Sequence, residues 1–392
     1  MKHAIVIADG AADAPSAVLG GRTTLQAAQV PTLDALARRG RLGVAPPPGP
    51  DIATTLLALL GYPPEKHQAG AGALRALARG QQTDLHAEVF CCDLVTVIDG
   101  YLRDFTAGFI PTAEAAPLIG ALNAEFADAG FEVRACHSYR NVALWEGVGK
   151  LAALPLSPPD QVLHEPLERH LPRGRQAQPL VDLVLRAHRL LSEHDVNVVR
   201  QDLGENPANA IWLWGGGPLP RLPRFAELYG VRGALVAGSD AARGLGQLIG
   251  WEVPAVPGAT GLPDTDYAAK GRAAVELLDA VELVCVHVRA PYILGRLGEV
   301  AGKLNALAAV DQQIVAPLLE RLSAEPDWRM LVIATPATSA LHAAQQPLHT
   351  VLLLAGSGID SHRGEAFDEQ SAAIGEIQPE RVCDLMEYAL RR

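Results

Sequence analysis

Short apolar runs, each ended by turn residues, recur along this chain and constrain its fold more than any other feature. They are four to six residues long, and several are separated by helix-like segments with apolar residues at three- and four-residue spacing. Runs of this kind are typical of strands that are covered on both faces, as in a parallel sheet. The runs occupy residues 4–8, 210–214, 233–237, 283–288, 330–333 and 350–354, and the helix-like segments include 268–278 and 303–322. The pattern predicts an open α/β fold, with a mostly parallel sheet flanked by helices and ligands bound at the carboxyl ends of its strands.

One region departs from this alternation. Residues 86–145 combine four strand-like pieces, including 88–99 and 101–105, with a helix-like piece at 113–129. A proline-rich stretch follows at residues 154–174. We therefore predict a smaller α+β cap domain over residues 86–174, inserted into a core domain made of residues 1–85 and 175–392.

Composition narrows the classes of partner. The chain has 392 residues and a formal net charge of −11, with no long basic run, which argues against nucleic acid as a ligand. A small anion needs only a local positive pocket, so it is compatible with this charge. The five cysteines show no C-x-x-C spacing, so neither a disulfide framework nor a zinc site is indicated. No apolar stretch approaches 18 residues and the N-terminal run is too short for a signal peptide, so we expect a cytoplasmic protein without membrane contact.

Several short strings, in order over nearly the whole chain, resemble those of one known family. They are Asp9-Gly10-Ala11-Ala12-Asp13, Pro31-Thr32-Leu33-Asp34, Leu60-Gly61-Tyr62, Ser138-Tyr139-Arg140, Val256-Pro257-Gly258-Ala259-Thr260-Gly261, Asp264-Thr265-Asp266-Tyr267-Ala268-Ala269-Lys270 and Val286-His287-Val288. Together they resemble the archaeal-type cofactor-independent phosphoglycerate mutases of the alkaline phosphatase superfamily. The resemblance implies an alkaline-phosphatase-like core sheet, and relatives that interconvert 2-phosphoglycerate and 3-phosphoglycerate.

The resemblance also implies a demanding chemistry. Enzymes of this superfamily transfer a phosphoryl group through a covalent serine or threonine intermediate, held by two divalent metals such as manganese or zinc. The cations are needed because a phosphomonoester is negatively charged and repels its nucleophile. Clustered aspartate and histidine side chains hold such metals.

Of the seven positions that the resemblance assigns to this site, only Asp9 holds the expected residue type. The nucleophile position falls on Ile52, which has no hydroxyl group. The metal-ligand positions fall on Tyr292, Arg296, Thr335, Pro336 and Gln345. An arginine at position 296 would be a fixed cation, which repels a metal ion. The resemblance therefore predicts a chain without catalytic residues, without metal ligands apart from the remnant Asp9, and without a bound cofactor.

Two arginines remain as candidate substrate-binding residues. Arg140 belongs to the Ser-Tyr-Arg string, and Arg243 stands where relatives place a lysine or arginine before Gly-x-Gly. Guanidinium groups suit phosphate and carboxylate ligands, so we expect a small phosphorylated or acidic metabolite. Ala71 stands where relatives place another substrate-binding arginine.

Other polar residues have simpler interpretations. We expect Asp9 to cap the turn after the first strand, and His287 to be a satisfied core histidine. Hydroxyls and carboxylates near helix starts are expected to act as caps, at Thr54, Thr55, Asp264 and Asp266. Surface or packing roles are expected for His342 and His349.

Three hypotheses for function follow. The leading one is a catalytically silent homologue of the mutase that binds a metabolite or acts through a protein partner or as a homo-oligomer. The second is an active metal-dependent mutase or phosphatase, in which Asp9 would converge with relocated ligands from His137, His342 and His349. The third is a structural subunit whose cleft is filled by Tyr292 and Arg296.

Overall fold

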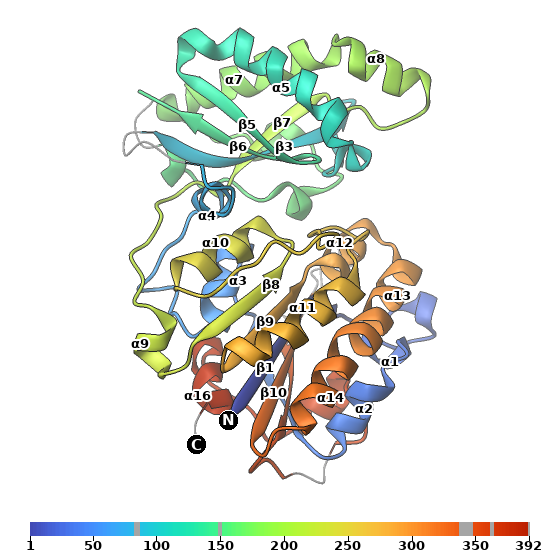
Figure 1. Cartoon of the computed structure of the whole chain (residues 1–392). Coiled ribbons are helices and arrows are strands. Elements are labelled where there is room, and N and C mark those ends of the chain that lie inside the picture. Colours follow the sequence, from blue (N-terminus) through green and yellow to red (C-terminus); the bar gives the residue numbers. More distant parts are fainter. Residues whose placement is uncertain (82–86, 148–150, 337–347, 361–363, 391–392) are drawn as a thin grey trace. The chain divides into compact units, whose positions relative to one another are not determined.

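Two compact units make up the chain in a computed structural model, and each is described by itself (Figure 1). The structure describes residues 1–81, 87–147, 151–336, 348–360 and 364–390. The first unit comprises residues 1–67 and 221–392, and the second comprises residues 68–220. The second unit extends beyond the predicted cap domain, residues 86–174, at both ends.

A six-stranded sheet forms the centre of the first unit, in the spatial order β2-β11-β10-β1-β9-β8. The strands β10, β1, β9 and β8 run parallel to one another, whereas β11 is antiparallel to both β10 and β2. This confirms the predicted mostly parallel sheet. The strands are β1 (Lys2–Ala12), β2 (Arg41–Ala45), β8 (Gly233–Ala237), β9 (Leu283–Val288), β10 (Trp328–Pro336) and β11 (Thr350–Gly356).

Helices flank this sheet (Figure 1). They are α1 (Thr24–Ala27), α2 (Pro31–Ala37), α3 (Ile52–Leu59), α9 (Phe225–Tyr229), α10 (Asp240–Leu248), α11 (Tyr267–Ala280), α12 (Ala290–Leu297), α13 (Val300–Val310), α14 (Ala316–Ser323), α15 (Glu369–Ala373) and α16 (Leu385–Leu390). The predicted helix at 303–322 is α13 and α14, joined by a π-helical turn at Asp311–Val315. The buried Asp311 carboxylate accepts hydrogen bonds from the N–H groups of Thr32 and Leu33, so this turn caps the start of α2.

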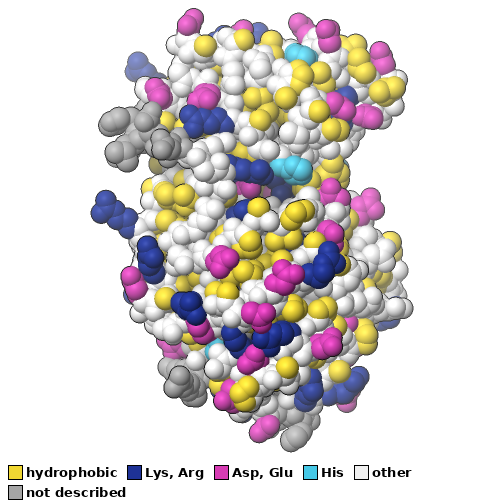
Figure 2. Space-filling model, in the orientation of Figure 1, with side chains coloured by type: hydrophobic (Ala, Val, Ile, Leu, Met, Phe, Trp, Pro, Cys, Tyr) yellow, Lys and Arg dark blue, Asp and Glu magenta, His cyan; other side chains and the backbone are white. Residues whose placement is uncertain are grey.

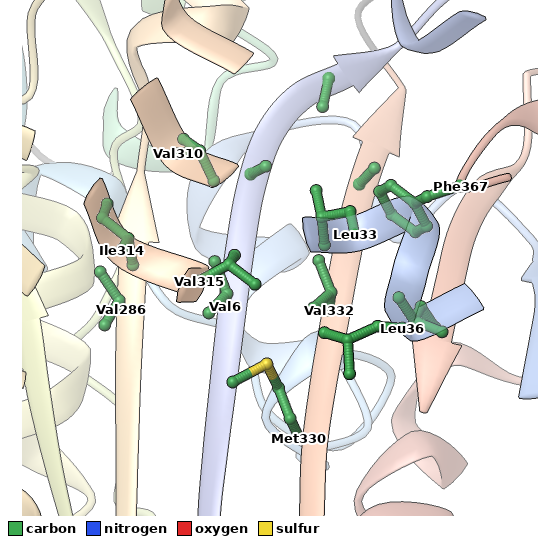
Figure 3. Packing of buried hydrophobic residues seen from close by; sticks show 14 of the residues in the cluster. Val6, Leu33, Leu36, Val286, Val310, Ile314, Val315, Met330, Val332 and Phe367 are labelled. Carbon is green, nitrogen blue, oxygen red and sulfur yellow. The ribbon is translucent and has the colours of Figure 1, made fainter. Parts of the chain in front are cut away.

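Alternate residues of the strands build the core on the face covered by α2, α11, α13 and α14 (Figure 3). Val6, Val286 and Val332 are in register on adjacent strands, and their side chains point to this face. They pack with Ile314 and Val315 of the π-helical turn. Each fully buried side chain of this size contributes roughly 1.5 to 3 kcal/mol to folding. The opposite side chains, such as Ile5 and Ile7, are also buried, as expected for a sheet covered on both faces.

The second unit is built on an antiparallel sheet. Its strands are β3 (Glu88–Ile98), β4 (Tyr101–Asp104), β5 (Phe131–His137), β6 (Arg140–Trp145) and β7 (Ala210–Trp214). They follow the path β4-β3-β6-β5, and β7 pairs with β3. The run at 210–214 is therefore a strand, as predicted, but it pairs antiparallel with β3 in this second sheet. Buried antiparallel and parallel strands have the same apolar character, so the run alone could not reveal its partner.

Helices and side chains complete the second unit. The helices are α4 (Ala71–Ala78), α5 (Thr112–Phe126), α6 (Leu167–His170), α7 (Gln178–Ser192) and α8 (Asp195–Asp202). Asn123 of α5 exchanges two hydrogen bonds with the backbone of Val133, at 2.7 and 2.9 Å. This carboxamide satisfies the outer edge of β5 at that residue, which removes a site for pairing with another strand.

Surface charges are interspersed on the face shown in Figure 2, where Lys and Arg side chains lie among Asp and Glu side chains. Arg232 and Glu282 are one exposed pair of opposite charge, with Nη2 and Oε1 2.6 Å apart. No helix in the described part of the chain is long and apolar enough to cross a bilayer.

Candidate functional site

Three adjacent strands of the first unit bring polar side chains together near their carboxyl ends. Asp9 lies in β1, His287 and Arg289 lie at and just after the end of β9, and Thr335 lies near the end of β10. The parallel registers place Ala8 opposite Val288 on one side and opposite Ala334 on the other. Asp9, His287, Arg289 and Thr335 form what we call the strand-end cluster.

The Asp9 carboxylate is the centre of this cluster. Its Oδ2 lies 2.5 Å from Nη1 of Arg289, and its Oδ1 accepts a hydrogen bond of 2.7 Å from the Thr335 hydroxyl. The same hydroxyl oxygen accepts a hydrogen bond of 2.8 Å from the N–H of Gly10. Nε2 of His287 lies 3.7 Å from Oδ2 of Asp9, which is longer than a hydrogen bond. The prediction that Asp9 caps a turn was wrong, because β1 continues to Ala12 and the carboxylate contacts the neighbouring strands.

Backbone packing holds Arg289 in place over this carboxylate. The Arg289 guanidinium lies 4.0 Å from the centroid of the Tyr292 ring, within range of a cation–π interaction. Gly10 has φ +73°, and a Cβ atom there would lie 2.3 Å from Cα of Tyr292. Position 10 therefore requires glycine, because any side chain would push the start of α12 away from β1.

Charge controls the protonation of the cluster. Burial alone would raise the pKa of Asp9, but the Arg289 guanidinium, His287 and the Thr335 hydroxyl together hold that pKa well below its usual range. Burial lowers the pKa of His287, and Arg289 and Lys270 lower it further against the opposing effect of Asp9. Asp9 is therefore an anion, and its charge is balanced by an arginine of the same chain.

Comparison with known proteins places this chain in a family. A family model described as 2,3-bisphosphoglycerate-independent phosphoglycerate mutase matches residues 37–197. Proteins with that name from Methanothrix thermoacetophila and Methanosarcina barkeri are 38% and 37% identical to the chain. The alignments cover 96% and 98% of both partners, respectively. The chain belongs to the 2,3-bisphosphoglycerate-independent phosphoglycerate mutase family.

Solved structures agree with this assignment. The cofactor-independent phosphoglycerate mutase of Thermoplasma acidophilum superposes with a TM-score of 0.57 and 26% identity, covering 99% of this chain and 100% of that one. A protein from Pyrococcus horikoshii superposes with a TM-score of 0.75 at 23% identity, covering 99% and 96%, and shares the fold.

The metal pair implied by the mutase family requires several oxygen and nitrogen ligands around Asp9. Among the described residues, no group of three or more His, Cys, Asp or Glu side chains is arranged to hold a metal ion. One oxygen of Asp9 is paired with a guanidinium and the other accepts a hydroxyl hydrogen bond. A fixed cation at 2.5 Å opposes a divalent cation at the same oxygen, so the described donor set does not fit the two metals.

Two of the other predicted site positions are Ile52, at the start of α3, and Thr335, in β10. Ile52 is the first residue of α3 and is buried, and the preceding Asp51 caps the helix by accepting from the N–H groups of Ala53 and Thr54. The Thr54 hydroxyl donates to Asp51 at 2.9 Å, so the cap of α3 is Asp51 and the predicted capping role of Thr54 was wrong. Thr335 is buried in the cluster.

The remaining metal-ligand positions lie around or beyond α12. Tyr292 and Arg296 belong to α12, where Arg296 is buried and Tyr292 is half-buried. Pro336 is the last residue of β10. Gln345 lies outside the described residues, as does His342.

The two candidate anion-binding arginines lie in different units. Arg140 begins β6 in the second unit, where its Nε donates to the Tyr139 hydroxyl at 3.1 Å. Arg243 lies in α10 of the first unit, where its Nη1 donates to the carbonyl oxygen of Pro254 at 2.9 Å. Of the relocated ligands in the second hypothesis, His349 is exposed and belongs to the first unit, and His137 lies at the end of β5 in the second unit.

The described structure also shows functional candidates that sequence reasoning missed. Arg289 was not singled out, although it directly follows the Val-His-Val string. Lys270 is fully buried, and its Nζ donates to the carbonyl oxygens of Thr260 at 3.1 Å and His287 at 3.5 Å. Asp266 caps α11 by accepting from the N–H of Ala269, as predicted.

A separate pocket of about 470 Å³ lies beyond Asp9 in the same unit. Its polar lining includes Asp13, Thr23 and Glu369, which are bonded to one another or to the buried Lys303. Glu369 accepts from the Asp13 N–H and from the Thr23 hydroxyl, and Lys303 Nζ donates to Asp13 at 2.9 Å. These contacts hold the loop after β1 against α15. This structural role explains why polar side chains line the pocket.

Proposed function

We propose that this member of the mutase family binds a small phosphorylated or acidic metabolite and does not interconvert phosphoglycerates. The observation that carries the proposal is the pairing of Asp9 with Arg289 and Thr335. A carboxylate committed to a guanidinium is unavailable as a metal ligand, and without metals the nucleophile and the ester oxygens stay uncompensated. The isoleucine at the nucleophile position supports the same proposal.

Arg140 and Arg243 support the binding part of the proposal. Each is partly buried and is oriented by a hydrogen bond of its own unit, to Tyr139 and to Pro254 respectively. A guanidinium carries a planar fork of N–H donors whose geometry matches phosphate or carboxylate. The ligand class is therefore an anion with phosphate or carboxylate groups.

The test compares the full chain with the Methanothrix thermoacetophila relative. Both proteins are incubated with 2-phosphoglycerate or 3-phosphoglycerate and manganese, and interconversion is followed by NMR. We expect turnover by the relative and none above the protein-free rate by this chain. Turnover comparable to that of the relative would contradict the proposal.

Binding is tested separately by calorimetry with 3-phosphoglycerate and with uncharged glycerol. We expect binding of the anion alone, weakened at least about tenfold in Arg140→Met or Arg243→Met because each removes a charged hydrogen bond. Arg232→Met, which changes an exposed pair, is the matched control. Absence of binding by wild type would leave a structural subunit as the better description.

A further inference from the structure

The strand-end cluster joins three strands through a single carboxylate. Asp9 in β1 bonds to Thr335 in β10 through Oδ1 and to Arg289, just after β9, through Oδ2. The Thr335 hydroxyl oxygen also accepts from the N–H of Gly10, which adds a second link between β1 and β10. One negative charge thus connects the carboxyl ends of three adjacent parallel strands.

This charge lies where solvent cannot stabilise it. The Asp9 side chain is 5% exposed and that of Arg289 is 12% exposed. A buried carboxylate without a compensating cation is costly to fold, since transfer from water removes its hydration. The cluster therefore needs a positive charge within contact distance of Asp9.

Packing holds the Arg289 guanidinium beside the Asp9 carboxylate. Arg289 is stacked on the Tyr292 ring, and Tyr292 is held against β1 by its close approach to Gly10. Stacking on the Tyr292 ring restricts the rotamers of the Arg289 side chain. Less conformational entropy is therefore lost when the guanidinium pairs with Asp9. Within the described residues, the buried Lys270 is a further cation that acts on the cluster, through its effect on His287.

We infer that Arg289 supplies the positive charge at the carboxyl ends of these strands and stabilises the fold by neutralising Asp9. The first unit therefore requires no divalent metal for stability. This inference rests on the proposed function and deepens it, because it states what compensates the surviving carboxylate. It treats Arg289 as a positioning and stabilising residue and assigns it no chemical step.

The first experiment is thermal unfolding of the full chain with EDTA, with manganese and without additions. We expect the same Tm within about 1 °C in the three conditions for wild type. Arg289→Ala should lower the Tm by on the order of 10 °C, because it leaves a buried charge unpaired. Arg232→Ala, which removes an exposed arginine whose contact with a carboxylate is 2.6 Å long, should lower it by less than about 2 °C.

The second experiment is chemical rescue by a soluble guanidinium ion. The deletion in Arg289→Ala leaves space beside Asp9, so guanidinium chloride at low millimolar concentration should raise the Tm of this variant. The same salt should not raise the Tm of wild type or of Asp9→Asn/Arg289→Ala, in which no charge remains to be neutralised. Sodium chloride at equal ionic strength is the control for screening.

Defined results would overturn the inference. A loss of several degrees in wild type with EDTA, or a similar gain with manganese, would show that a metal performs the neutralisation. Equal responses of Arg289→Ala and the double variant to guanidinium would show that Arg289 acts through packing alone. If Arg289→Ala does not fold, the double variant decides, since partial recovery of the folded state supports the inference and failure to recover overturns it.

These outcomes are separate from those of the proposed function. Phosphoglycerate turnover would remove the proposal of a silent homologue, whereas the melting experiments report on charge compensation at Asp9. A protein that binds no phosphoglycerate can still show the predicted rescue.

Discussion

Two buried arginine–aspartate pairs, one in each unit, have nearly the same geometry but different surroundings. Asp9 and Arg289 approach to 2.5 Å in the first unit, and Arg75 and Asp93 approach to 2.5 Å in the second. In the second unit the pair is enclosed by further bonds, from Arg75 to the carbonyl oxygen of Asn141 and from the Trp214 indole to Asp93. The pair between α4 and β3 is thus a saturated part of a sheet core.

The strand-end cluster is less complete than the Arg75–Asp93 pair. Its histidine, His287, is buried, and neither ring nitrogen has a hydrogen-bond partner among the described residues. The predicted burial of His287 is confirmed, whereas the described residues supply no hydrogen-bond partner for its ring. A buried donor and acceptor without partners is costly, and this cost is located at the carboxyl ends of strands, where ligands bind in α/β folds. The comparison teaches that pairs with similar contact distances can have different surroundings, one in the core of a sheet and one at the carboxyl ends of parallel strands.

Breaking the saturated pair should have the largest effect. Asp93→Asn leaves Arg75 buried and without its carboxylate, so we expect the second unit to lose about 3 to 5 kcal/mol of unfolding free energy. Urea unfolding followed by hydrogen exchange of β3 measures this loss. The double variant Arg75→Met/Asp93→Leu should recover much of the lost unfolding free energy. A loss below about 1 kcal/mol in Asp93→Asn would contradict the view that the Arg75–Asp93 pair is the more strongly enclosed of the two pairs.

Lys270 shows what a buried cation costs when its hydrogen-bond partners among the described residues are carbonyl oxygens. Burial lowers its pKa to about 8, despite the opposing effect of Asp264. The unfolded lysine keeps its proton up to about pH 10, so the unfolded state binds more protons between pH 8 and 10. Unfolding free energy should therefore rise through this window, by roughly 2 to 3 kcal/mol at most.

The measurement is urea unfolding of wild type and Lys270→Met at pH 7, 8, 9 and 10. The difference between the two proteins should change in favour of wild type as the pH rises. A constant difference would show that Lys270 does not lose its proton in the folded state at these pH values.

The hydroxyl of Thr335 tests how far the strand-end cluster depends on hydrogen bonds. Thr335→Val keeps the shape but removes the bonds to Asp9 and Gly10, so we expect a loss of about 1 to 3 kcal/mol. Thr335→Ser retains the hydroxyl and should lose less. Equal losses in the two variants, measured by urea unfolding, would indicate that the methyl group and not the hydroxyl is responsible.

An exposed pair provides the smallest expected effect. Arg134 and Glu132 form two contacts of 3.0 Å on β5, with both side chains accessible to water. Solvent and salt screen such pairs, so Glu132→Gln should cost less than about 1 kcal/mol. A larger loss in urea unfolding would mean that contact distance, and not burial, sets the strength of these pairs.

Much of the fold was predictable because the apolar runs are local signals. The runs at 4–8, 283–288 and 330–333 are strands of the central sheet, and the segment at 268–278 is α11. Strand partners were not predictable in the same way, as the run at 210–214 shows. The Asp9 position was found through the resemblance, whereas Arg289 carried no signal of its own until the structure placed it beside the carboxylate.

The sequence by itself determined that a carboxylate lies at the end of the first apolar run. That isoleucine, tyrosine, arginine, threonine, proline and glutamine stand at the family's other site positions stays a prediction from the resemblance. Both statements are possible from sequence because side-chain chemistry is fixed at each position once the order of the motifs is known. Only the tertiary structure decided which cation neutralises Asp9 and how Thr335 connects two strands. Those contacts join residues about 280 and 326 positions apart, and their distances depend on strand register and on the packing of Tyr292 against Gly10.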